Sequence, residues 1–104
     1  MSRLFSAGNG KQLTASGVVT TEGKAGVLLA YCIKCGTTDT NVEFRDGGVA
    51  GTIRWEDGMN GEAVAGEVYV RLAFPIPIAF STDIYAVITG TGAEVTIEYV
   101  ETEA

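Results

Sequence analysis

Alternation of apolar and polar side chains, interrupted by glycine, is the feature that most limits what this chain can fold into. The clearest case is residues 67–74, Glu-Val-Tyr-Val-Arg-Leu-Ala-Phe, in which Val68, Val70 and Leu72 share one face with Phe74. Successive side chains of a strand point to opposite faces of its sheet, so this pattern predicts a strand with one buried face. Residues 93–100 repeat the pattern, and their clean alternation predicts an antiparallel sheet with one solvated face.

Further strand-like segments are residues 11–21, 25–35, 41–45, 49–56, 75–80 and 83–89. Asp46-Gly47-Gly48 lies between the third and the fourth of them and is typical of a tight hairpin. Residues 25–35 are nearly all apolar, which predicts a central strand covered on both faces. The two prolines of residues 75–80 cannot donate ladder hydrogen bonds, so this segment is expected to be an edge strand or a strand-like crossover.

These segments predict an all-β fold, an antiparallel sandwich of about eight strands, and no window shows a helical stripe. A chain of 104 residues is expected to form one domain. We predict a flexible N-terminal arm over residues 1–10, a single β-sandwich domain over residues 11–100 and an acidic tail over residues 101–104.

The charge pattern restricts the partners. The net charge is −6, and the seven basic residues are scattered singly, whereas a phosphate-binding surface needs clustered Lys and Arg. We therefore expect no nucleic acid and no membrane as a direct partner. Residues 72–104 contain acids but no base. That segment is either a solvated acidic edge or a surface that docks onto a basic partner. The N-terminal residues lack the apolar stretch of a secretory signal, so synthesis in a cytoplasm is expected.

Nothing in the sequence favours catalysis. The chain contains no histidine, so it cannot form a Ser-His-Asp or Cys-His arrangement. Cys32 and Cys35 lack the second ligand pair of a zinc site and, three residues apart in a strand, would point to opposite faces. Residues 57–62 are rich in oxygen ligands but lack the spacing of an EF-hand calcium loop. We predict a protein that is not an enzyme and that holds no metal or cofactor.

Aromatic residues and the N-terminal arm are the candidate contact residues. Trp55, Tyr69 and Tyr85 could form an aromatic surface for sugars or for another subunit. Tyr69 and Tyr85 each lie opposite the apolar face of their strand. This indicates that a partner covers the face that carries the tyrosine. In the arm, Arg3, Leu4 and Phe5 are expected to gain order only when they bind a partner.

The second half of the chain resembles small virion proteins of tailed bacteriophages. The resemblance rests on residues 74–99, with a proline-bearing strand, Ile84-Tyr85-Ala86-Val87, a Thr-Gly-Thr-Gly turn and a last strand that closes on Tyr99-Val100. The hairpin of residues 42–52 is also similar to theirs, and the likeness covers roughly residues 15–100. It implies a jelly-roll-like sandwich that assembles with itself, often as a trimer, and that decorates or cements a capsid.

Two functions follow as expectations. The first is a non-enzymatic structural virion protein, a capsid decoration or cement protein whose partners are further copies of itself, in a trimer, and the major capsid protein on the capsid exterior. The alternative is a carbohydrate-binding or receptor-binding β-sandwich of a phage fibre or tail, in which aromatic side chains stack on the ligand.

Overall fold

A computed structural model describes residues 9–102 of the chain. These residues form eight strands and no helix: β1 (Asn9–Leu13), β2 (Gly17–Val18), β3 (Gly26–Lys34), β4 (Thr40–Asp46), β5 (Thr52–Met59), β6 (Tyr69–Phe80), β7 (Ile84–Thr89) and β8 (Glu94–Glu101). Over the described range, therefore, no helix is long and apolar enough to cross a membrane.

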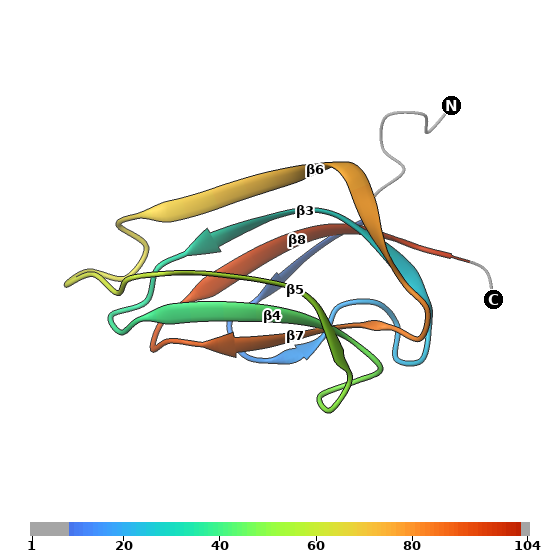
Figure 1. Ribbon diagram of the computed structural model, residues 1–104. Coiled ribbons are helices and arrows are strands. Elements are labelled where there is room, and N and C mark those ends of the chain that lie inside the picture. Colours follow the sequence, from blue (N-terminus) through green and yellow to red (C-terminus); the bar gives the residue numbers. More distant parts are fainter. Residues whose placement is uncertain (1–8, 103–104) are drawn as a thin grey trace.

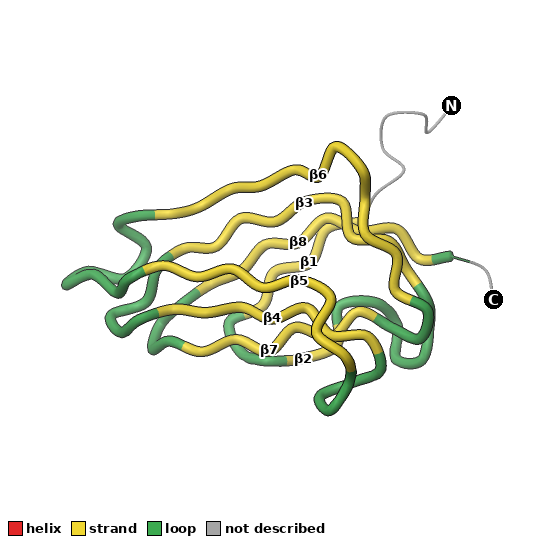
Figure 2. The backbone as a smooth tube through the Cα atoms, in the orientation of Figure 1, coloured by secondary structure: helices red, strands yellow, loops and turns green. Residues whose placement is uncertain are grey.

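The strands form two four-stranded antiparallel sheets that pack face to face (Figures 1 and 2). Sheet A has the order β1-β8-β3-β6 and sheet B has the order β2-β7-β4-β5. The predicted all-β antiparallel sandwich is thus confirmed. The pairs β1–β8, β2–β7, β3–β6 and β4–β5 are compatible with a jelly roll, in which a long antiparallel hairpin of strands is rolled into two sheets.

The predicted alternation is confirmed in the last strand. In β8 the side chains of Val95, Ile97 and Tyr99 are buried, whereas Thr96 and Glu98 are exposed. The buried set meets Phe44, Phe80, Leu28 and Ile84 in the core between the sheets. Burial of this apolar face, at about 25 cal/mol per Å², is the main source of stability in such a sandwich.

Strand β3 is central, as predicted, but only one of its faces is fully covered. It pairs with β6 on one side and with β8 on the other. Leu28, Tyr31 and Ile33 are buried against sheet B, whereas Ala30 and Cys32 on the outer face are half-buried. The expectation of two fully covered faces is therefore wrong for the single chain.

The predicted number of strands is confirmed, but their division along the chain differs. Residues 67–74 and 75–80 were expected to be two strands, and residues 69–80 form one edge strand. Pro75 and Pro77 lie in a bulge, because residues 74–77 stand opposite the single residue Leu29 of β3. Residues 11–21, expected as one strand, divide at 14–16 into β1 of sheet A and β2 of sheet B.

The predicted domain boundaries shift slightly. Asn9 and Gly10 belong to β1, so the sheet includes two residues that were assigned to the arm. Glu101, assigned to the tail, is the last residue of β8. Its carboxylate accepts a hydrogen bond of 2.6 Å from the Thr21 amide, which lowers the pKa of Glu101. The rest of the predicted arm and tail lies outside the described residues.

The Asp-Gly-Gly hairpin joins β4 to β5 as predicted, although β5 starts at Thr52 and not near Val49. Gly47 and Gly48 have φ of 104° and 81°, a conformation that favours glycine. The carboxylate of Asp83 accepts hydrogen bonds from both glycine amides, at 3.2 and 3.0 Å. Asp46, at the end of β4, accepts hydrogen bonds from the amides of Ser81 and Thr82 at 2.8 Å. The hairpin and the β6–β7 turn are thus bound to each other.

Candidate interaction surface

One side of the sandwich is open. Strands β5 and β6 are the outermost strands of their sheets, and both lie on the side that faces the viewer in Figure 1. They meet through Trp55 and Phe74, whose rings are perpendicular with centroids 5.1 Å apart. Several apolar side chains along this side pack against the core but stay half-buried: Trp55, Met59, Val70, Leu72 and Phe74. The open side therefore exposes apolar surface together with two strand edges that no strand of residues 9–102 pairs with.

A polar network crosses between the sheets at this side. The Tyr31 hydroxyl donates a hydrogen bond of 2.6 Å to Asp57 and accepts one of 2.8 Å from the Trp55 indole. Burial, and then the hydrogen bond to Asp57, raise the pKa of Tyr31 above its usual range. The tyrosine thus stays protonated and keeps donating to the carboxylate. The network fixes β5 against β3, and its role is structural.

Trp55 takes a different place from the one expected. Its side chain lies on the inner face of sheet B, opposite Phe44 of β4, and it contacts Phe74 and Tyr31. The three aromatics of the predicted surface do not come together, because Trp55 points into the sandwich while Tyr69 and Tyr85 lie on the outer faces of opposite sheets. The prediction of one aromatic surface built from all three residues is therefore wrong.

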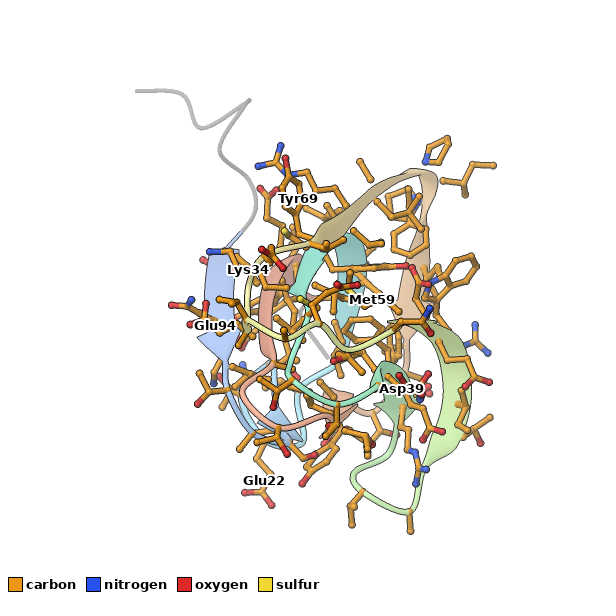
Figure 3. All side chains as sticks on the ribbon, turned by 90° about the vertical axis from the view of Figure 1, so that its left-hand side faces the viewer. Glu22, Lys34, Asp39, Met59, Tyr69 and Glu94 are labelled. Atoms are coloured by element: carbon orange, nitrogen blue, oxygen red, sulfur yellow. The ribbon has the colours of Figure 1, made fainter. Side chains whose placement is uncertain are left out.

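Tyr69 is the most exposed of the three aromatics. It is the first residue of β6 and is 55% exposed. It stands opposite Lys34 of β3, and the Arg71 guanidinium lies 5.6 Å from the centre of its ring. Figure 3 shows Tyr69, Lys34 and Glu94 following one another along one side of the molecule. Lys34 and Glu94 form an exposed ion pair of 4.0 Å and line a polar hollow of about 340 Å³ with Ala65, Gly66 and Gly92.

Tyr85 lies on the outer face of sheet B, opposite Arg45, and is half-buried. With Val18, Glu22, Val49 and Asp83 it lines a hollow of about 360 Å³. Asp83 is 6% exposed, and its oxygens already accept hydrogen bonds from three glycine amides. Glu22 is therefore the carboxylate of this hollow that has no hydrogen-bond or ion-pair partner among residues 9–102.

The remaining sequence candidates form no site in the described residues. Arg3, Leu4 and Phe5 lie outside that range. Cys32 and Cys35 are free thiols. Cys32 lies on the outer face of sheet A, whereas Cys35 is buried and accepts a hydrogen bond from the Val68 amide. In residues 57–62 Asp57 turns toward Tyr31, and over residues 9–102 there is no group of three or more His, Cys, Asp or Glu side chains that could hold a metal ion.

Sequence reasoning missed the Tyr31–Asp57–Trp55 network. One signal was present, because Ile53, Trp55 and Met59 alternate with Arg54 and Glu56, which places Trp55 on an apolar face. The carboxylate of Asp57 on that same face obscured the alternation. Comparison of the chain with protein-family models, with curated proteins and with solved structures found no match.

Proposed function

We propose that this protein is a non-enzymatic structural protein that works through protein–protein contacts, as a decoration or cement protein on the capsid exterior of a tailed bacteriophage. The observation that carries the proposal is the open side of the sandwich, where the outer edges of β5 and β6 have no partner strand within residues 9–102 and lie beside half-buried apolar side chains. Such a surface favours association with another protein. The resemblance to small virion proteins supports the same assignment, and further copies of the chain and the major capsid protein are the proposed partners.

The direct test is binding to shells assembled from the major capsid protein encoded nearest to this gene. We expect the purified protein to sediment with the shells at a fixed ratio and to raise their unfolding temperature, because added contacts stabilise only the assembled state. A protein that stays in the supernatant at every concentration would contradict the proposal.

The hollow around Tyr85 favours a second candidate, a carbohydrate-binding module. A half-buried aromatic ring beside the exposed carboxylate of Glu22 has the chemistry to stack on a sugar and to accept hydrogen bonds from its hydroxyls. Binding on a glycan array that is lost in Tyr85→Ala and kept in Tyr69→Ala would support this function. Since Trp55 points into the sandwich, it is not the residue to test.

A further inference from the structure

The free edge of β6 is the least protected part of the open side. β6 pairs with β3 along one edge, and no strand of residues 9–102 pairs with the other. It is twelve residues long and contains one charged residue, Arg71. A long apolar edge with few charges is a template for pairing with another strand.

The hydrogen-bonding groups at this edge can be assigned from the register. The Cys35 amide donates to the Val68 carbonyl at 2.9 Å. This bond continues the register in which Lys34 pairs with Tyr69 and Ile33 with Val70. In an antiparallel pair, successive residues direct their N–H and C=O groups to alternate sides. Tyr69 and the odd-numbered residues that follow it, up to residue 73, therefore present these groups at the free edge. Pro75 ends the row of donors because it has no N–H.

Side chains beside this row are exposed and partly apolar. Val68 is 42% exposed, Tyr69 is 55% exposed, and Val64 in the preceding loop is 60% exposed. Glu67 and Arg71 are also exposed. The ion pairs within residues 9–102 are Lys34–Glu94 and Arg45–Glu43, so neither Glu67 nor Arg71 has an ion-pair partner there. The chain thus holds an acid and a base, two residues to either side of Tyr69, that form no ion pair within residues 9–102, although the Arg71 guanidinium lies over the Tyr69 ring.

We infer that the partner of this edge is a second copy of the same chain, paired antiparallel about a twofold axis at Tyr69. In this register Tyr69 stands opposite its own copy. Glu67, which precedes β6 and whose amide donates to the Val64 carbonyl at 3.3 Å, comes level with Arg71 of the other copy. Opposite charges directly across a strand pair are favourable, whereas a register centred on Arg71 would bring two guanidinium groups together. Charge complementarity therefore selects both the occupant and the register. Such a contact uses the same patch on both copies and closes as a dimer.

This inference rests on the proposed self-association and specifies a dimer in place of the trimer that the resemblance implies. The test is sedimentation velocity over a concentration series of the full chain and three variants. We expect a dimer for the unaltered chain. Arg71→Glu, which places Glu67 opposite a second acid at two symmetric positions, should raise the dimer dissociation constant about tenfold. The swapped variant Glu67→Arg/Arg71→Glu restores both ion pairs and should return the constant to within about threefold of the original.

The matched control is Arg54→Glu on β5, which makes the same change in net charge on the other exposed edge and should leave the dimer unaffected. A dimer insensitive to Arg71→Glu, a swapped variant that fails to recover, or a trimer would each overturn the inference. A chain that stays monomeric yet binds capsid shells would overturn it and leave the proposed function intact. A dimer that obeys the charge swap but binds no shell would overturn the proposed function alone.

Discussion

Strands β5 and β6 occupy equivalent places, as edge strands on the same side of the sandwich, yet they are protected in different ways. β5 has charged Arg54 and Glu56 on its outer face and binds Tyr31 through Asp57 and Trp55 on its inner face. β6 has a single charge and two prolines, and its inner side chains contribute apolar contacts only. The difference is what the proposed self-association through β6 requires, since β5 is bound to β3 by the network and β6 is not.

The largest expected effect is a difference in stability between an aromatic substitution on β5 and one on β6. Trp55→Ala removes the packing against Phe74 and the hydrogen bond to Tyr31, so it should lower the free energy of unfolding by about 3 kcal/mol. Tyr69→Ala on β6 serves as the comparison, because its ring is 55% exposed and its loss should cost less than about 0.5 kcal/mol. Chemical denaturation measures both variants. Similar costs would mean that the two strands are anchored alike.

A second prediction concerns the Tyr31 hydroxyl, which binds β5 through its hydrogen bonds to Asp57 and Trp55. Tyr31→Phe leaves the carboxylate of Asp57 and the indole N–H of Trp55 without this partner, which should cost about 1–2 kcal/mol in unfolding free energy. The control is Tyr99→Phe, since Tyr99 is also buried and the structure gives its hydroxyl no hydrogen bond to any described residue. A loss as large in the control would assign the effect to general packing and not to the network.

Asp46 connects the ends of the two edges, because it lies at the start of the hairpin into β5 and binds the amides that follow β6. Burial tends to raise the pKa of Asp46, but the hydrogen bonds from Ser81 and Thr82 outweigh it and lower the pKa overall. With a lower pKa in the folded state, its stabilisation is complete above the ordinary value of about 3.9 and is lost as the pH falls through the folded value.

Asp46→Asn should therefore cost about 1 kcal/mol of unfolding free energy near neutral pH. The cost should shrink only as the pH falls below 4 toward the lowered pKa of the folded state, because the native carboxyl becomes protonated there. Urea denaturation at several pH values measures this, and Glu22→Gln is the control because Glu22 is exposed. A cost for Asp46→Asn that stayed constant down to pH 2 would show that the charge of Asp46 does not matter.

The same comparison shows what could be predicted from the sequence. Period-two alternation gave the faces of β8 and of residues 70–74 in β6 correctly, because a strand's two faces are determined by its own residues. It was wrong for Val68, which lies before β6 and is 42% exposed. The neighbours of a strand depend on contacts between distant residues, and every strand has the same period, so the sheet orders were not predictable. Trp55 illustrates the limit. Whether its ring is covered depends on Phe74, nineteen residues later, and on the hydroxyl of Tyr31. For Tyr69 only the position opposite the apolar face was predicted correctly, and its contact with a partner stays a prediction.

The smallest expected effect concerns Pro75. It tests whether proline, in place of charged residues, limits the pairing of other strands with the free edge of β6. Pro75→Ala should lower the free energy of unfolding by only about 0.5 kcal/mol, chiefly because the unfolded chain gains freedom. The substitution also adds a backbone N–H beyond Ala73, which lengthens the row of donors at the free edge. Light scattering should therefore detect more self-association at high concentration. Ile76→Ala, at the 84% exposed tip of the bulge, changes apolar surface without adding a donor and should not increase association. If both variants associate equally, exposed apolar area and not the missing N–H limits pairing at β6.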